Sequence, residues 1–386
     1  HGSYLPGDCT FILDPIAVRA NAAGVPEVED GALQAPDSPA YSVQIGSEAP
    51  MSDEYMRFFF DALSRNAARL AYDVAQVARV LAARPNEEIV LASLVRAGTP
   101  IGVLMHRALD LLGKKNVHYS ISATRKRGSD PCALDIILDK HNPEDVVFLD
   151  GWTGKGYIAG ELKEAMHGYN ATRGVNVDPS LVVLADLAGV SSVACSADDY
   201  LIPAAMLRST VCGLISASML NPKPQPENGG KLPDTCLFYE HLLDIDCSRI
   251  FVDTVSRELA KVIPELAGTP LVDWNDDARR QAREVSDKFV DEIMARYGMT
   301  DRNTTNPGGG LTPTTRNGLN PAPRIGPRGM ARAARHVLTA TGVSAVEWEN
   351  CRTSRRKKRR RDMADAAPYY NTGLPPEKWS VLKVRV

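Results

Sequence analysis

The chain has 386 residues and 44% apolar side chains, which is enough for one large domain or two ordinary ones with a sizeable core. No apolar run is long enough to cross a bilayer, and the N-terminal stretch lacks the basic and apolar parts of a signal peptide, which indicates a cytoplasmic protein without a membrane partner. The seven cysteines form no CxxC pair, a usage typical of reduced thiols rather than of a disulfide framework or a zinc ribbon.

The net charge of −2 conceals a strongly basic region near the C-terminus. Residues 324–361 carry twelve Lys and Arg against two acids, Glu347 and Glu349, which is a local charge of +10. The densest part, 352–361, has the composition of a nucleic-acid or polyanion contact. No aromatic residue interleaves that run, which argues against base stacking. We therefore expect a solvated segment at 352–361 in preference to a nucleic-acid contact.

The N-terminal part is expected to be loop-rich and to precede a long helix. Gly and Pro interrupt residues 1–47, which contain one strand candidate at 9–13. Apolar residues recur at spacings of three and four from Met56 to Leu81, the period of an amphipathic helix. Pro50 and Ser52 mark the start of that helix.

Strands and helices alternate along the middle of the chain. Buried strands are expected at 89–94, 117–122, 146–149 and 181–185, and helices at 99–112, 133–140, 157–166 and 201–216. Apolar strands joined by helical crossovers predict an α/β fold, a parallel sheet with helices on both faces. Ligands on such sheets bind beyond the carboxyl ends of the strands, so function is expected in the turns there.

The pattern changes after residue 220. A polar connector at 221–233 leads into two helical stretches, at 236–266 and 276–297, and then into a linker-like segment. We therefore divide the chain into an N-terminal loop or flap region (1–47), a core (48–225), a helical extension of that core (226–300), and a linker with a basic C-terminal region (301–386).

Three polar turns follow the predicted strands. The first contains Arg96 and Gly98, and the second runs from Asp150 to Gly156 at the start of a helix. Glycines let backbone N–H groups approach an anion there, and a helix N-terminus adds its dipole. The third turn, 125–127, supplies three adjacent cations.

In a parallel sheet these turns converge, which suits a ligand with two separate phosphate groups and a polyol between them. A dinucleotide fits less well because no GxGxxG follows the first strand of the alternating region. A nucleoside triphosphate fits less well because the sequence around Lys155 departs from GxxxxGK[ST].

Two of these turns carry a family resemblance. VRAGTP at 95–100 and VVFLDGWTGKG at 146–156 resemble motifs of the type I phosphoribosyltransferases. The similarity is greatest to the branch found beside tellurite-resistance genes, whose members are often labelled cysteine protease StiP. It covers roughly residues 2–300, including GSYLPGD at 2–8 and DDYLIPAAML at 198–207.

The resemblance implies a Rossmann-related, type I phosphoribosyltransferase-like fold, with an N-terminal flap and a mostly helical C-terminal part. It also implies a glycosyltransferase activity that moves 5-phosphoribosyl from phosphoribosyl pyrophosphate to a small-molecule acceptor. Mg²⁺ would assist the loss of pyrophosphate. The acceptor stays open among bases, amines and phenols, and the chain is compatible with a homo-oligomer.

The resemblance also implies roles for individual residues. The 5-phosphate would lie on Thr153, Gly154, Lys155 and Gly156, and the pyrophosphate on Arg96, Ala97, Gly98 and Arg127. The catalytic set would be Asp150, Arg96, Arg125 and Lys126, the last two on a loop that closes over the site.

Two further implications concern the ribose and the acceptor. Asp150 would contact the ribose hydroxyls and Mg²⁺, although Gly151 stands where most family members have a second acid. Acceptor recognition would involve Asp186, Asp199 and Arg208. For Asp199, an ordinary acidic start of a helix explains the sequence equally well.

Two alternatives to phosphoribosyl transfer remain. A cysteine protease needs a thiol beside an imidazole or an electropositive helix N-terminus. Cys132 is the candidate near cations and Cys195 lies in a loop, but neither belongs to a recognisable Cys/His arrangement. We therefore rank proteolysis below phosphoribosyl transfer. The other alternative is a non-catalytic nucleotide-binding regulator with a nucleic-acid-contacting tail, and the cations at 125–127 favour an enzyme over it.

Overall fold

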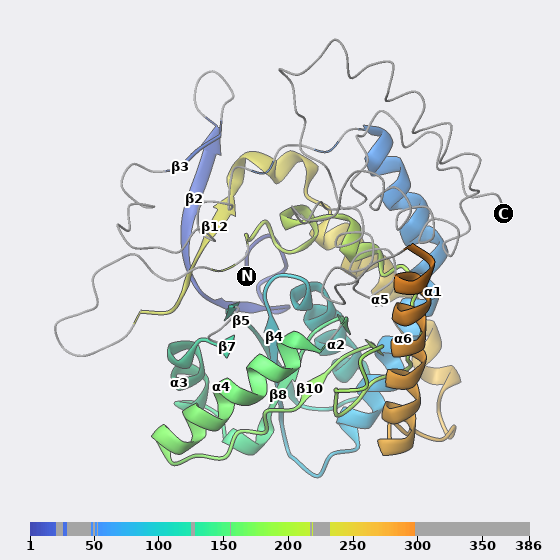
Figure 1. The fold of residues 1–386 in the computed structure, drawn as a ribbon. Coiled ribbons are helices and arrows are strands. Elements are labelled where there is room, and N and C mark those ends of the chain that lie inside the picture. The colour runs from blue at the N-terminus through green and yellow to red at the C-terminus, as the bar shows by residue number, and fades with distance from the viewer. Residues whose placement is uncertain are drawn as a thin grey trace.

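The computed structural model describes residues 1–20, 26–28, 48, 51, 53–124, 128–154, 156–216, 218 and 232–297. Its centre is a five-stranded sheet in the order β1 (Thr10–Ile12), β5 (Asn116–Ile121), β4 (Ile89–Leu94), β8 (Val146–Leu149) and β10 (Leu181–Val182). Every pair of neighbouring strands in this sheet is parallel (Figure 1). The predicted α/β fold with helices flanking a parallel sheet is thus confirmed.

Helices cover both faces of the sheet. The helices α1 (Asp53–Ala82), α2 (Gly98–Leu111) and α5 (Ser248–Glu265) pack together against one face, with Ile89 and Leu91 in their core. The helices α3 (Pro131–Leu138) and α4 (Tyr157–Arg173) cover the other face, with Val90 and Ala92 in their core. Since successive side chains of a strand point to opposite faces, an uninterrupted apolar strand such as β4 contributes to both cores.

The period of α1 explains its position. The side chains of Phe59, Leu63, Leu70, Val74, Val77 and Leu81 are buried and recur at helical spacing. Burying a large aliphatic or aromatic side chain of this kind contributes about 1.5–3 kcal/mol. The resulting apolar stripe faces α2 and α5, while the rest of the helix carries polar residues.

A second sheet pairs strands near the N-terminus with a strand from residues 235–239. It contains β12 (Thr235–Tyr239), β2 (Asp14–Ala20) and β3 (Pro26–Val28), with β12 parallel and β3 antiparallel to β2. The helix predicted from residue 236 was wrong over these residues. The segment TCLFY is rich in β-branched and aromatic residues, and β2 supplies the hydrogen-bonding partner that a strand requires. The 3₁₀ segment η5 (Glu240–Ile245) then leads into α5.

The helix predicted at 201–216 was also wrong. Only two short 3₁₀ segments occur there, η3 (Pro203–Met206) and η4 (Ser209–Val211). Pro203 lacks an N–H group, and Gly213 and Leu214 adopt positive φ values of 73° and 62°. These backbone conformations stop an α-helix from continuing.

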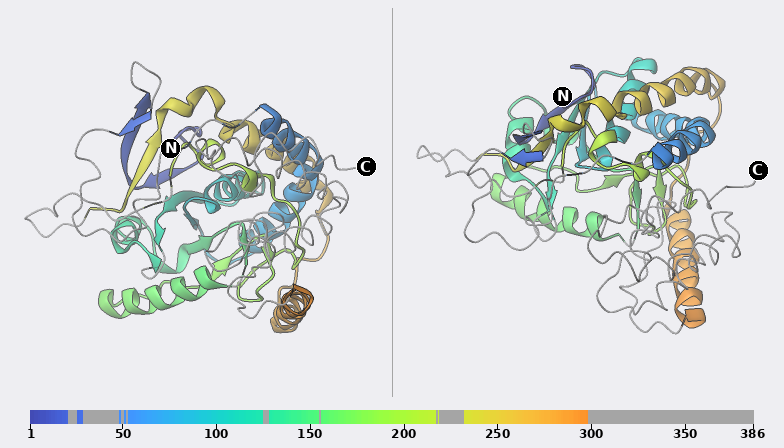
Figure 2. Two further views of the ribbon diagram at one scale, coloured as in Figure 1. Left: turned by 45° about the horizontal axis from the view of Figure 1, so that its top comes forward. Right: turned by 90° about the horizontal axis from the view of Figure 1, so that it is seen from above.

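Short elements complete the described part of the chain. They are β6 (Ala123–Thr124) with β7 (Gly128–Ser129), β9 (Trp152–Thr153) with β11 (Ala185–Asp186), and η2 (Pro143–Asp145). The helix α6 (Asp276–Tyr297) extends from the body of the fold, as the right-hand view of Figure 2 shows. None of the described helices combines the length and apolar character that a bilayer crossing requires. The basic run 352–361 and the rest of region 301–386 lie outside the described residues.

Candidate functional site

Two of the predicted turns meet at the carboxyl edge of the sheet. Gly98, the first residue of α2, lies so close to the end of β8 that a Cβ atom there would be 2.8 Å from the backbone oxygen of Leu149. The same atom would be 3.3 Å from Oδ1 of Asp150. The peptide bond between Val95 and Arg96, just before this turn, is cis. The convergence expected for parallel strands is therefore present at Gly98 and Asp150.

The guanidinium of Arg96 is committed to a carboxylate. Its Nη1 donates to Oε1 of Glu48 at 2.6 Å, and Oε2 of Glu48 accepts from the backbone N and Oγ of Ser209 at 3.0 and 2.6 Å. Burial lowers the pKa of Arg96, but Glu48, Cys212 and Tyr239 together raise it above its usual value. The positive charge of Arg96, which we expected to bind pyrophosphate, is thus balanced by Glu48 within the protein.

The hydroxyl of Thr153 is likewise held inside the protein. Its Oγ1 donates to Oδ1 of Asp186 at 2.5 Å, and Oδ2 of Asp186 accepts from the N and Oγ of Ser191 at 2.7 and 2.6 Å. Asp186 is fully buried, so it braces this turn from within, whereas Asp199 and Arg208 are exposed. Gly156 adopts a φ of 78° just before α4 begins.

Asp150 is the acid between the two turns. It is half-buried, and its Oδ1 accepts from the backbone N of Gly151 at 2.7 Å. Burial raises the pKa of Asp150 to about 7, against the opposing effect of that hydrogen bond. Lys155 and the loop of Arg125, Lys126 and Arg127 lie outside the described residues. Their ligand roles, the Mg²⁺ site and the homo-oligomer stay predictions.

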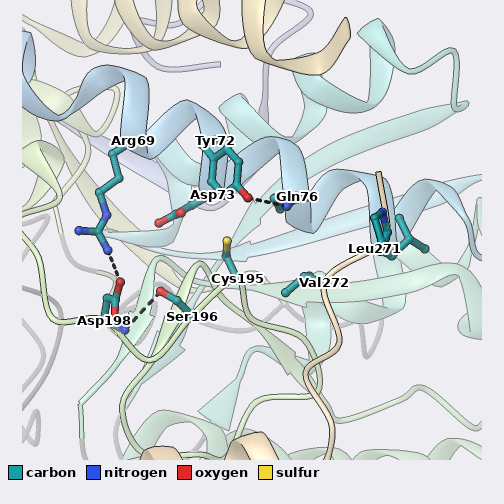
Figure 3. A pocket seen from close by; sticks show the side chains of 10 residues that line it. Arg69, Tyr72, Asp73, Gln76, Cys195, Ser196, Asp198, Leu271 and Val272 are labelled. Atoms are coloured by element: carbon teal, nitrogen blue, oxygen red, sulfur yellow. Dashed lines mark hydrogen bonds and ion pairs between the residues drawn. The ribbon is translucent and has the colours of Figure 1, made fainter. Parts of the chain in front are cut away.

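A different part of the fold presents a thiol. Of the cysteines in the described ranges, Cys9, Cys132, Cys212, Cys236 and Cys247 are buried, and Cys195 alone is partly exposed. The segment around Cys195 runs beside residues 182–185, where its backbone N donates to the oxygen of Leu184 at 3.0 Å. This pairing presents the Cys195 side chain toward α1 (Figure 3).

Cys195 lines a pocket of about 350 Å³ between α1 and the segment that follows α5. Helix α1 supplies Arg69, Tyr72, Asp73 and Gln76; the Cys195 segment adds Ser196 and Asp198; and Pro270, Leu271 and Val272 complete the lining. The four residues of α1 are spaced i, i+3, i+4 and i+7, which places them on one face of the helix. The sequence did not predict this pocket. The signal that could have indicated it is the interruption of the apolar positions of α1 by Asp73 and Gln76, which are both buried.

Two buried polar atoms at this site lack a hydrogen bond of normal geometry within the described residues, although their groups lie close to one another. Oδ2 of Asp73 and the hydroxyl of Tyr200 form no hydrogen bond of normal geometry with any described residue, although both are buried. An unpaired buried polar group typically costs about 1–3 kcal/mol. Burial raises the pKa of Asp73, while Tyr200, Cys195 and Arg69 oppose that rise. The carboxyl group is therefore poised to accept a proton or a hydrogen bond from a ligand.

Arg69 supplies the positive charge of the pocket. Its Cζ lies 4.0 Å from the centroid of the Tyr200 ring, and its Nη2 donates to Oδ2 of Asp198 at 2.6 Å. Burial raises the pKa of the Cys195 thiol and the Asp73 charge raises it further, while Arg69 lowers it. The balance keeps Cys195 protonated at neutral pH.

No histidine ring in the described part of the chain hydrogen-bonds to a cysteine. The ring of His118 instead contacts Oγ of Ser93 through Nε2 at 2.7 Å and the backbone oxygen of Asp8 through Nδ1 at 2.8 Å. Burial lowers the pKa of His118 to about 4. In the described part of the chain no histidine is placed to take the proton of Cys195, whereas Asp73 is.

Comparison with known proteins connects this chain to a family. The family model described as "Tellurite-like stress resistance cysteine protease StiP" matches residues 2–256. The protein called "Cysteine protease StiP" from Acinetobacter baylyi (strain ATCC 33305 / BD413 / ADP1) is 33% identical over 311 residues, which is 79% of each chain. No solved structure matches this chain significantly.

These matches contradict the predicted phosphoribosyltransferase. The assignment to the type I phosphoribosyltransferases, the glycosyltransferase class and a role in nucleoside-like biosynthesis were wrong, and the matches support the cysteine-protease alternative. Glycine-rich turns at strand ends are common to open α/β sheets, so their presence indicates the fold more than the reaction. In this chain Arg96 and Thr153 bond to Glu48 and Asp186, which accounts for their polar character without a phosphate ligand.

Proposed function

Because the chain belongs to the StiP family of tellurite-like stress resistance cysteine proteases, we propose that it hydrolyses peptide bonds with Cys195 as the nucleophile. One observation carries the choice of residue. Within the described ranges Cys195 is the thiol that is partly exposed, lines a pocket and faces a buried carboxyl group. The five other described thiols are buried.

The geometry supports a direct proton transfer from sulfur to carboxylate. As Sγ of Cys195 bonds to the scissile carbonyl carbon, its proton passes to Asp73. The carbon–nitrogen bond then breaks, and Asp73 returns the proton to the leaving amine. Water hydrolyses the resulting thioester, giving its proton to Asp73 as it attacks, and the thiol is restored. The raised pKa of Asp73 makes it a stronger base than an exposed carboxylate.

Charge in the pocket supports the oxyanion that forms during attack. Arg69 is the cationic side chain that lines the pocket, and it already favours the ionised form of Cys195. A preorganised positive charge in a partly enclosed site stabilises developing negative charge more than solvent would. Arg69 therefore acts on both the thiolate and the tetrahedral intermediate.

The chemistry of a thiol nucleophile also bears on the cellular compartment in which the protein works. We propose that the protein works in a reducing, cytoplasmic compartment, because the described cysteines are all free and a thiol nucleophile must stay reduced. Fractionation of cells that produce the full chain tests this location. Recovery of the protein from an oxidising compartment with disulfides formed would contradict it.

The proposal is tested by hydrolysis of an unfolded protein substrate under reducing conditions. Cys195→Ala should lower the rate by about 10³-fold or more, since the nucleophile is lost. Cys132→Ala removes a buried thiol from α3 and serves as the matched control, and Cys351→Ala tests the cysteine outside the described residues. Retained hydrolysis by a folded Cys195→Ala variant would contradict the proposal.

A further inference from the structure

The two ends of the Cys195 pocket differ in chemistry. Arg69 and Asp198 form an ion pair at one end, and Leu271 and Val272 stand at the other, with Cys195 between them in Figure 3. Leu271 keeps 45% of its surface exposed although it is a large apolar residue. Ligand sites combine apolar walls with a few polar groups in this way.

The apolar wall is fixed to helix α1 before any ligand binds. Nη1 of Arg79 donates to Oγ1 of Thr269 at 2.9 Å, and Nη2 donates to the backbone oxygen of Thr269 at 2.5 Å. Nη1 of Arg79 also donates to Oε1 of Gln76 at 2.9 Å, and Nε2 of Gln76 donates to the Tyr72 hydroxyl at 2.9 Å. Preorganised walls of this kind lower the ordering cost of binding.

We infer that the protease selects an apolar side chain on the residue that supplies the scissile carbonyl, and that Leu271 and Val272 are the residues that select it. This inference rests on the proposed function of Cys195. Attack requires the carbonyl carbon to lie about 3–3.5 Å from Sγ, which brings the side chain on the adjoining Cα within reach of the same pocket. A volume of about 350 Å³ holds one large side chain together with its carbonyl group.

The charge distribution favours an apolar occupant over a charged one. Arg69 is paired with Asp198 and in the proposed reaction faces the oxyanion, while Asp73 exchanges a proton with Cys195, so these charges are engaged and are not left to bind a charged substrate side chain. A charged side chain at the opposite end would lose its hydration against Leu271 and Val272. These wall residues lie outside residues 2–256, so the family match does not account for them.

A peptide library from a denatured proteome provides the test, with cleavage sites mapped by mass spectrometry. The wild-type protein should cut after Leu, Met, Phe and Ile at least about tenfold more often than after Asp or Lys, the scale of discrimination by an apolar pocket. Leu271→Asp should remove this preference and shift cleavage toward Lys and Arg. Leu243→Asp is the matched control, because Leu243 is 55% exposed and does not line the pocket.

Peptidyl chloromethyl ketones separate this inference from the proposed function. They alkylate Cys195 without hydrolysis, and a Leu-bearing probe should react at least about tenfold faster than an Asp-bearing one. Hydrolysis that needs Cys195 but shows no apolar preference would overturn the inference and leave the proposed function in place. Faster alkylation by the Leu-bearing probe without any hydrolysis would support selection by Leu271 and Val272 and overturn the proposed peptidase activity. Equal alkylation by both probes would overturn the inference whether or not hydrolysis occurs.

Discussion

The carboxyl group of Asp73, on α1, and the thiol of Cys195 lie in one pocket, and each acts on the proton affinity of the other. Burial raises the pKa of both groups. The negative charge of Asp73 raises the pKa of Cys195 further, whereas the thiol lowers the pKa of Asp73. The pair therefore holds a proton on sulfur beside a carboxylate that can take it.

Replacing Asp73 tests its role as proton acceptor. Asp73→Asn keeps the size of the side chain and removes its basicity, so kcat/KM for peptide hydrolysis should fall by about 10²-fold or more. Steady-state kinetics with a cleaved peptide measure this loss. Asp61→Asn, an exposed carboxyl on the same helix, should leave kcat/KM unchanged. A folded Asp73→Asn variant within a few-fold of wild type would show that another group takes the proton.

The same variant should make the resting thiol more reactive. Asp73→Asn removes a negative charge that raises the pKa of Cys195, so the thiolate fraction near pH 8 should increase. Iodoacetamide labelling, followed on the peptide that contains Cys195, should be faster in the variant while hydrolysis is slower. Slower labelling in Asp73→Asn would mean that the carboxyl group promotes the thiolate instead of opposing it.

Asp150 should make the stability of the fold depend on pH. Burial raises its pKa from 3.8 to about 7, so between these values the folded state keeps a proton that the unfolded chain has released. Its contribution to stability is full below about pH 4 and is lost as the pH rises through about 7. Asp150→Asn should therefore stabilise the protein near pH 8 by up to about 4 kcal/mol and change little near pH 4.

Urea unfolding of both proteins at the two pH values measures this difference. Asp139→Asn removes an exposed carboxyl and should show the same difference from wild type at both pH values. An equal effect of Asp150→Asn at pH 4 and pH 8 would mean that folding does not raise the pKa of Asp150.

Two glycine substitutions test how closely the turn of Gly98 approaches the turn of Asp150. Gly98→Ala would place a Cβ 2.8 Å from the backbone oxygen of Leu149, which cannot move as a side chain can, and should destabilise the fold by about 1–3 kcal/mol. Gly168→Ala, in the exposed face of α4 with open space around it, should instead stabilise the fold by about 0.5–1 kcal/mol. Thermal unfolding of the two variants measures both effects, and a neutral Gly98→Ala would mean that the turns lie further apart.

The sequence by itself determined the elements whose signal is local. The run of apolar residues in β4 and β8 predicted strands buried on both faces, and the three-and-four spacing of α1 predicted its inner stripe. The meeting of Gly98 with Asp150 was also predictable, because parallel strands end at one edge of their sheet. For the strands and the helix one short segment contains the whole pattern, and for the two turns the parallel order of the strands is sufficient.

Only the tertiary structure decided which groups become partners. Arg96 meets Glu48, Thr153 meets Asp186, and β12 becomes a strand because β2 lies beside it, all across long separations in the chain. The pairing of Asp73 with Cys195 likewise depends on where α1 lies against the segment after β11. The spacing of apolar residues shows which face of a helix or strand is buried. It does not show which segment covers that face, because distant parts of the chain decide this when they pack together. For this reason the sequence indicated the fold correctly and the reaction wrongly.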